Sequence, residues 1–232
     1  MSADDDVIRR YGGVPLKPED VTPYERWAMS YFRDRDLVSD PEMEVTVRLD
    51  ITRVEEEYAR AGAEAEGGTL TAFLTWRLLR ALALHPCFNL RFLGGSWYRF
   101  PSPPLFFPVL GSGDRRFLDI LIEGAALMPW EEFARVQHRR IEEARARPEA
   151  CPPVDEETWS VAVFIGNLPY LDFTSLGIFR NVRHSGRPVF YFGRRSRGEG
   201  RLTVPLYVRF DHASTDPLLL DGLIRDFLAG AS

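Results

Sequence analysis

Apolar residues recur along the chain with two periods, one typical of helices and one typical of strands. We expect helices at residues 22–32, 69–84, 129–147 and 216–228, and strands at residues 44–51, 160–165, 188–192 and 202–210. Strands interleaved with helices, and a last third rich in strands, predict an α/β (α+β) two-layer sandwich. In this fold class a mixed sheet is packed with helices.

Local residues predict where several of these elements begin, end or bend. Thr22 and Asp216 each precede a proline, and this pair is typical of an N-cap followed by the first helical position. Pro205 falls inside the strand at residues 202–210, which favours an edge strand or a bulge there. Residues 198–200, Gly-Glu-Gly, predict a tight turn before that strand.

The chain shows no internal repeat and no long low-complexity linker. Residues 1–19 are polar and rich in glycine and proline, so we expect an N-terminal arm followed by a single domain at residues 20–232. No apolar run is long enough to span a bilayer, and the acidic start differs from a signal peptide. We therefore expect a cytoplasmic location and no membrane partner.

Charge and composition remove several function classes. The chain has 34 acidic and 29 basic residues, a net charge of -5, which gives no general attraction to nucleic acid. Lys17 is the sole lysine and lies in a Gly/Pro-rich segment, so neither a Walker phosphate loop nor Schiff-base catalysis is expected. Cys87 and Cys151 form no close-spaced pair, which argues against a disulfide framework and a cysteine zinc site.

Four histidines are candidates for chemistry, and one of them stands apart. No His-x-x-x-His or His-Glu-x-x-His pattern exists, so no metal site is expected. His85, His138 and His184 are interpreted as structural or solvent-facing. His212 directly follows a predicted strand and precedes a predicted helix, and such a corner can present an imidazole as a general base. The alternative for His212 is a loop histidine beside a helix N-cap.

Motifs in the correct order give the chain a family resemblance. His212 to Asp216 is similar to the His-x-x-x-Asp-Gly signature of the chloramphenicol acetyltransferase family, and residues 167–175 resemble its Pro-Trp-x-x-Phe-x-Ser segment, with Tyr170 in the Trp place. The strand at residues 45–52, the helix end at residues 83–88 and residues 24–26 also fit. The likeness runs from about residue 20 to the C-terminus and extends, more distantly, to the catalytic domain of the dihydrolipoyl acyltransferases.

The resemblance implies roles for individual residues. His212 would be the general base, and Ser175 would donate a hydrogen bond to the oxyanion of the tetrahedral intermediate. A strand-end hydroxyl bonded to backbone is the alternative for Ser175. Asp216 would pair with Arg26 of the first helix and fix the histidine loop, and it can also serve as an N-cap. Pro217 departs from the family glycine, which puts the shape of this loop in question.

The resemblance also implies ligands and assembly. Arg194 and Arg195 would contact the phosphates of coenzyme A, with a solvated hairpin tip as the alternative. Tyr31, Phe32 and Thr174 would line the acceptor pocket. An acyl-CoA such as acetyl-CoA would be a co-substrate, with no permanently bound cofactor. The chain would form a homotrimer with active sites at the subunit interfaces.

The leading functional hypothesis is an acyltransferase that moves an acyl group from a CoA thioester to a hydroxyl of a small molecule, either an antibiotic or a biosynthetic intermediate. One alternative is a natural-product tailoring or condensation enzyme that uses an acyl carrier protein thioester. An oxoacid-dehydrogenase acyltransferase core ranks lower, because we see no lipoyl or subunit-binding domain in the sequence. A non-catalytic trimeric binding protein of the same fold is the non-enzyme alternative.

Overall fold

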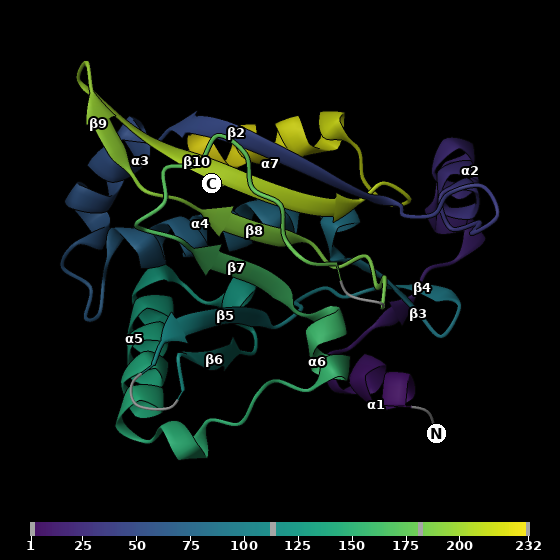
Figure 1. The fold of residues 1–232 in the computed structure, drawn as a ribbon, viewed down its shortest axis with the longest axis horizontal. Helices are drawn as coiled ribbons and strands as arrows, with labels where there is room; N and C mark the ends of the chain where they lie inside the picture. The colour runs from purple at the N-terminus through teal and green to yellow at the C-terminus, as the bar shows by residue number, and fades with distance from the viewer. Residues whose placement is uncertain (1–2, 112–114, 181–182, 231–232) are drawn as a thin grey trace.

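The computed structural model describes residues 3–111, 115–180 and 183–230. Its main sheet consists of β2 (Glu42–Asp50), β5 (Leu105–Leu110), β6 (Phe117–Ile122), β7 (Val163–Asn167), β8 (Val189–Phe192), β9 (Ser196–Gly198) and β10 (Arg201–Asp211). The strand order is β2-β10-β8-β7-β5-β6, with β9 paired to β10 (Figure 1). The β5–β7 and β7–β8 pairs are parallel and the other pairs are antiparallel, so the sheet is mixed, as predicted.

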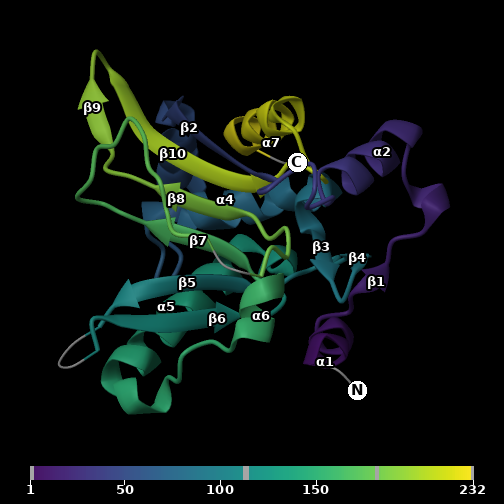
Figure 2. The same ribbon diagram turned by 45° about the vertical axis from the view of Figure 1, so that its right-hand side comes forward.

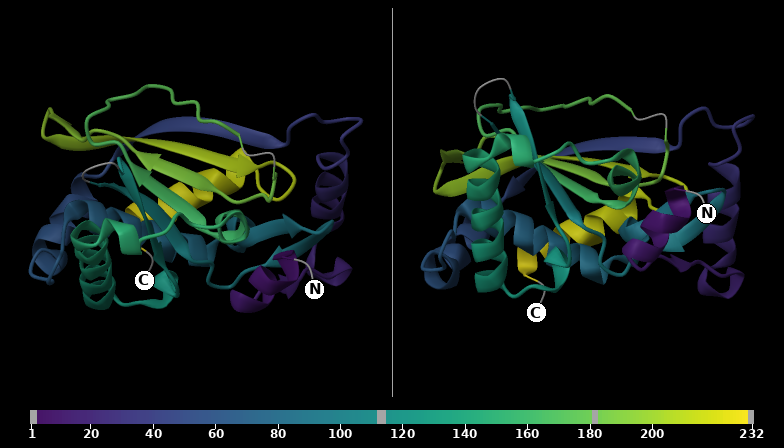
Figure 3. Two further views of the ribbon diagram at one scale, coloured as in Figure 1. Left: turned by 60° about the horizontal axis from the view of Figure 1, so that its bottom comes forward. Right: turned by 90° about the horizontal axis from the view of Figure 1, so that it is seen from below.

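The chain forms seven helices in its described residues, and three of them cover one face of this sheet. The helices are α1 (Ala3–Arg10), α2 (Pro23–Tyr31), α3 (Thr52–Glu57), α4 (Leu70–Leu84), α5 (Trp130–Ala146), α6 (Glu156–Val161) and α7 (Pro217–Ala229). Short 3-10 turns lie at Pro18–Asp20, Pro86–Asn89, Ala125–Leu127 and Pro148–Ala150, and a π turn lies at Tyr58–Gly62. Helices α4, α5 and α7 lie together on one side of the sheet (Figure 3). The predicted two-layer α/β sandwich is confirmed.

The main core lies between this face of the sheet and the helices. Leu78 of α4 and Phe227 of α7 are each 1 % exposed and pack in one cluster with Val204 and Val208 of β10, which are fully buried. Burying such side chains contributes about 1.5–3 kcal/mol each. Among the described residues, none of the helices combines the length and the apolar character that crossing a bilayer requires.

The helix starts predicted from local residues are confirmed. Thr22 Oγ1 accepts from the Glu25 amide at 3.2 Å, and the Glu25 carboxylate accepts from the Thr22 amide at 2.7 Å. This reciprocal pair is a capping box that satisfies two free amides at the start of α2. Asp216 Oδ1 accepts from the amides of Leu218 and Leu219 at 2.8 and 2.9 Å and caps α7. Pro217 occupies the first helical position without disturbing the helix.

Of the two alternatives predicted for Pro205, an edge strand or a bulge, the edge strand is wrong, because β10 lies between β2 and β8. Pro205 pairs with Arg48 of β2, whereas the pairing with β8 begins only at Leu206. The Pro205 carbonyl accepts from the Gly193 amide at 2.9 Å, just past the end of β8. The missing N–H of Pro205 therefore falls at a position where the pairing with β8 requires no hydrogen bond.

Two further sequence predictions need correction. Residues 160–161 end helix α6, so the strand predicted at residues 160–165 begins only at Val163. Residues 105–110, for which the sequence pattern predicts no strand, form strand β5. Pro108 pairs with Asp119 of β6 but lies beyond the two residues of β5 that pair with β7. This proline too falls where its strand has a neighbour on one side only.

The N-terminal arm is packed against the domain. Strand β1 (Val14–Pro15) joins β4 (Ser96–Arg99) and β3 (Leu90–Leu93) in a small second sheet beside α1 (Figure 2). Val7 and Tyr11 of the arm are buried in a cluster with Phe100 and Val161. Residues 1–2 of the predicted arm lie outside the described residues, and the division at residue 19 stays a prediction.

The end of helix α7 depends on a buried arginine of α4. Arg77 is 3 % exposed and donates to the carbonyls of Phe227 and Leu228, and it also pairs with Glu57. These carbonyls have no intrahelical partner, so Arg77 acts as a C-cap from another element.

Replacing Arg77 with methionine should lower the free energy of unfolding by about 2–3 kcal/mol, because buried carbonyls lose a charged donor. Urea unfolding measures the change. Arg225→Met is the matched control, since Arg225 also serves α7 but its side chain is 70 % exposed and pairs with Asp221 at 2.8 Å. That variant should lose at most about 0.5 kcal/mol. Equal losses for the two variants would contradict the capping role of Arg77.

Candidate active site

His212 lies where β10 ends and the turn into α7 begins. Its amide donates to the Pro41 carbonyl at 2.8 Å, and its Nδ1 lies 3.0 Å from the Thr215 carbonyl. A carbonyl can only accept, so Nδ1 carries the proton and the neutral imidazole has its lone pair on Nε2. Nε2 has no partner among the described residues. The half-buried ring is therefore held in the tautomer that a general base needs.

A buried ion pair between Arg33 and Asp211 supports the histidine loop. The side chain of Asp211 is fully buried and that of Arg33 is 8 % exposed. Burial raises the pKa of Asp211, and the guanidinium of Arg33 offsets part of that rise. The second carboxylate oxygen of Asp211, Oδ1, accepts from the Ala213 amide at 2.8 Å. The backbone carbonyl of Asp211 accepts from the Thr215 amide at 3.0 Å. Asp211 thus holds the backbone of the turn that follows His212.

The predicted pair of Arg26 with Asp216 is wrong, because the structure does not bring the two side chains together. Arg26 is exposed on α2 and donates to the Pro18 carbonyl at 2.7 Å. Asp216 acts as the N-cap of α7. The charge pair that fixes the loop instead uses Arg33, seven residues after Arg26, and Asp211, five residues before Asp216. A carboxylate directly before His212 was the sequence signal for it.

Aromatic side chains of α2 and of the residue after it form a row of ring contacts that ends at His212. The rings of Trp27 and Tyr31 stack with centroids 5.1 Å apart, and Tyr31 meets Phe32 edge-on at 5.2 Å. The Phe32 ring lies 4.4 Å from the imidazole of His212. Trp27 is 50 % exposed and Tyr31 is 38 % exposed. Two of the three residues predicted for the acceptor pocket, Tyr31 and Phe32, therefore lie beside the histidine.

An irregular segment, residues 168–180, crosses the sheet on the face opposite the helices (Figure 3). At one end the carboxylate of Asp172 accepts from Arg48 at 2.8 Å. At the other end the Phe179 carbonyl accepts from Arg209 at 2.8 Å. Because Arg48 pairs with residue 205 of β10, the segment follows β10 from about residue 205 to residue 209.

Ser175 and Thr174 lie between these two contacts, alongside the middle of β10, and both are exposed. Leu176 packs against the apolar cluster that contains Tyr207. Tyr207 precedes His212 by five residues, which corresponds to about 16 Å of extended strand. The structure therefore separates Ser175 and Thr174 from His212 within one chain.

The side chains of the two arginines predicted to contact coenzyme A, Arg194 and Arg195, lie in different environments. The side chain of Arg194 is 55 % exposed and lies 3.8 Å from Asp172 of the crossing segment. Arg195 donates to Thr71 Oγ1 of α4 at 3.2 Å, and burial lowers its pKa. Adjacent residues in extended backbone face opposite sides, which explains the divergence. Arg194 has an exposed guanidinium, whereas that of Arg195 is half-buried against α4.

One cluster of potential metal ligands lies on the same face as the crossing segment. Single ligand atoms of Asp40, Glu42 and His184 lie within 4.8 Å of one another. Arg180 forms an ion pair with Asp40, and Arg209 lies 3.4 Å from Glu42. Guanidinium groups already neutralise both carboxylates, and their charge opposes a metal cation. We assign no metal site to this cluster.

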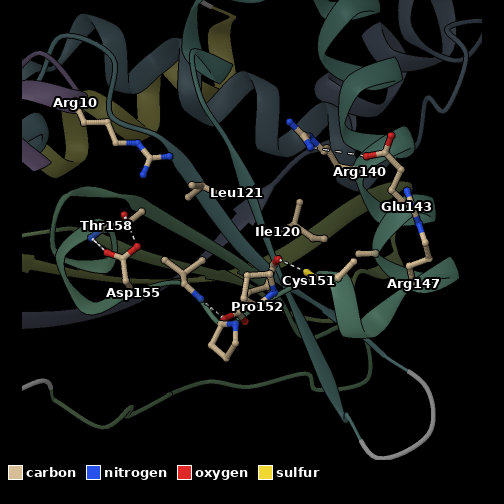
Figure 4. A pocket seen from close by; sticks show the side chains of 15 residues that line it. Arg10, Ile120, Leu121, Arg140, Glu143, Arg147, Cys151, Pro152, Asp155 and Thr158 are labelled. Carbon is tan, nitrogen blue, oxygen red and sulfur yellow. Dashed lines mark hydrogen bonds and ion pairs between the residues drawn. The ribbon is translucent and has the colours of Figure 1, made fainter.

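Two cavities are described in the structure. A cavity of about 350 Å³ lies beside β6 and α5, with Arg10, Arg140 and Arg147 among its lining residues (Figure 4). A second, of about 320 Å³, is lined by Arg33. None of the predicted site residues lines either cavity.

No family model and no curated protein sequence matches the chain at a significant level. Solved structures do match. A chloramphenicol acetyltransferase superposes with a TM-score of 0.71 at 16% identity, over 94% of this chain and 98% of that one. The dihydrolipoamide acetyltransferase of Azotobacter vinelandii, studied for the role of a serine, a histidine and an asparagine in its catalytic mechanism, gives 0.63 at 17% identity, with 94% and 93% covered.

A truncated catalytic core of the 2-oxoacid dehydrogenase complex from Thermoplasma acidophilum gives a TM-score of 0.64 at 16% identity, with 92% of this chain and 95% of that one covered. All three matches cover nearly the whole of both chains, so the likeness concerns the complete domain and not a shared fragment. The resemblance predicted from the sequence motifs is thereby confirmed at the level of the fold. The chain has the fold of chloramphenicol acetyltransferase and of the catalytic domains of dihydrolipoamide acetyltransferases.

Proposed function

We propose that the chain is an acyltransferase that moves an acyl group from a CoA thioester to a hydroxyl of a small molecule. The observation that carries the proposal is the state of His212. Its Nδ1 is fixed by the Thr215 carbonyl at 3.0 Å, its ring contacts Phe32, and its Nε2 is left to accept a proton. The exposed aromatic rings on α2 favour an acceptor with an apolar or aromatic body beside its hydroxyl.

In the proposed reaction, Nε2 of His212 takes the proton of the acceptor hydroxyl as its oxygen attacks the thioester carbonyl carbon. The tetrahedral intermediate carries an oxyanion, and the hydroxyl of Ser175 donates a hydrogen bond to it. When the C–S bond breaks, the imidazolium returns the proton to the departing thiolate. The products are the acylated acceptor and the free thiol, and the histidine ends neutral.

The proposed site requires two copies of the chain. Ser175 lies along the middle of β10 and His212 beyond its end, on the basis of the contacts of Asp172 and Phe179. A reacting thioester that touches both side chains would have to lie between one copy's Ser175 and another copy's His212. A closed ring of copies, such as the proposed homotrimer, would supply this arrangement at each interface.

The direct test is a free-thiol assay of the purified protein with a panel of acyl-CoAs and small alcohols. The proposed function predicts thiol release that depends on both the thioester and the alcohol, together with the acylated alcohol in the mass spectrum. An acylated carrier protein in a parallel arm tests the alternative donor. If neither donor is cleaved with any acceptor while the protein is folded, the proposed function is wrong.

A mixing experiment tests the shared site. His212→Gln and Ser175→Ala should each be poorly active alone, because each lacks one of the two groups in every site. Mixed oligomers, formed by unfolding and refolding the two variants together, should regain activity, because some interfaces then combine an intact Ser175 with an intact His212. Activity of the mixture equal to the mean of the separate variants would contradict a site shared between copies.

A further inference from the structure

The second cavity is a basic pocket close to the histidine loop. It lies between the residues that follow α2, the turn from β3 to β4, and the segment before β8. Arg33, Arg35, Arg183 and His184 line it, and Asp4 is the one carboxylate among the described lining residues. The pocket therefore has an excess of cationic groups, in a chain whose net charge is -5.

The arginines of this basic pocket differ in how far they are neutralised. Arg183 lies 3.5 Å from Asp4 and 3.5 Å from Glu157. Arg35 donates to the Ser39 carbonyl at 2.7 Å and forms no ion pair with a carboxylate of the described residues. Arg35 thus contributes a positive charge that the surrounding protein does not cancel.

Arg33 contributes a buried donor. Its two Nη atoms donate to Asp211 and to the His184 carbonyl, and its guanidinium lies over Phe92 at 4.6 Å. Its Nε is buried and has no acceptor among the described residues. An unpaired buried N–H costs free energy, and an anion in the adjoining pocket is a suitable acceptor for it.

His184 lies among several positively charged side chains. Burial and then the charges of Arg35 and Arg33 lower the pKa of His184. Arg180 and Arg209 act in the same direction, while Asp40 lies 4.0 Å from its Nδ1. A second cation is thus disfavoured beside this wall of the pocket, and an anion is favoured.

We propose that the basic pocket binds a small anion of the phosphate class, with Arg35 supplying the charge and Arg33 Nε a hydrogen bond. Guanidinium groups match phosphate oxygens in geometry and charge, and a volume of about 320 Å³ accommodates one phosphate group with a short attached chain. Because Arg33 also holds Asp211, the anion contacts the residue that fixes the His212 loop. Binding does not depend on acyl transfer, so this proposal and the proposed function can fail separately.

Isothermal titration calorimetry of the full chain with inorganic phosphate, at an ionic strength held constant with sodium chloride, tests the proposal. We expect saturable binding by the wild type and at least about tenfold weaker binding by Arg35→Gln. Arg140→Gln is the matched control, because it removes one positive charge from the cavity beside α5, and its phosphate affinity should stay within about twofold of the wild type. Arg35 is exposed, so its variant should keep the wild-type melting temperature.

A second titrant identifies the source of the phosphate group. Adenosine 3′,5′-bisphosphate that binds more tightly than phosphate, and loses that affinity in Arg35→Gln, points to the phosphates of a nucleotide such as coenzyme A. Binding of inorganic phosphate alone points to a free phosphate or a small phosphate ester. The proposal is overturned if the wild type shows no saturable binding of either titrant above chloride, or if Arg35→Gln and Arg140→Gln bind alike.

Discussion

Replacing His212 with glutamine should lower the turnover number for acyl transfer by about 10²- to 10⁴-fold, the usual contribution of a positioned general base. Glutamine cannot take the proton of the acceptor hydroxyl. Its amide can still donate to the Thr215 carbonyl, which lies 3.0 Å from Nδ1 in the wild type, so the loop should keep its shape. The KM for the thioester should change little. The measurement is the initial rate of free-thiol release at saturating acceptor.

The matched control is His138→Gln, which makes the same substitution on the exposed face of α5. This variant should keep the wild-type turnover number and melting temperature. A His212→Gln variant that folds normally and retains the wild-type turnover number would refute the proposed role of His212. Loss of activity in both variants would instead point to a general effect of the substitution on the fold.

The parts of the fold that depend on neighbouring residues were predictable from the sequence. The starts of α2 and α7 follow from Thr22 and Asp216 with their prolines, because a cap needs only residues within three positions. The position of Pro205 was not predictable, since its cost depends on where strand β8 ends, 13 residues earlier in the sequence. Strand order and strand ends are set by long-range packing, which short patterns do not contain.

The same distinction applies to the candidate site. His212 was predicted because a strand, a turn and a helix follow one another directly around it. The charge pair that fixes its loop was not predicted, since Arg33 and Asp211 are separated by 178 positions and the family resemblance pointed to Arg26 instead. The packing of Arg33 on Phe92 and Trp97 selects it, and these rings come from the small second sheet that the sequence did not predict.

Removing one partner of the Arg33–Asp211 pair should be the most damaging single change for stability. Asp211→Asn leaves the guanidinium of Arg33 buried without its counter-charge, which typically costs about 3–5 kcal/mol of unfolding free energy. Activity should fall mainly through the turnover number, because the carboxylate holds the Ala213 amide and so the loop that orients His212. Urea unfolding and thiol-release kinetics, measured at a temperature where the variant is folded, give the two quantities.

The controls separate this buried pair from charge effects in general. Asp221→Asn breaks the exposed pair with Arg225, whose side chains are 61% and 70% exposed, and should cost at most about 0.5 kcal/mol. Arg33→Lys keeps the charge but not the planar fork, so it should retain part of the stability and part of the turnover number. If Asp211→Asn loses no more stability than Asp221→Asn, or raises KM while leaving the turnover number unchanged, the pair does not position His212.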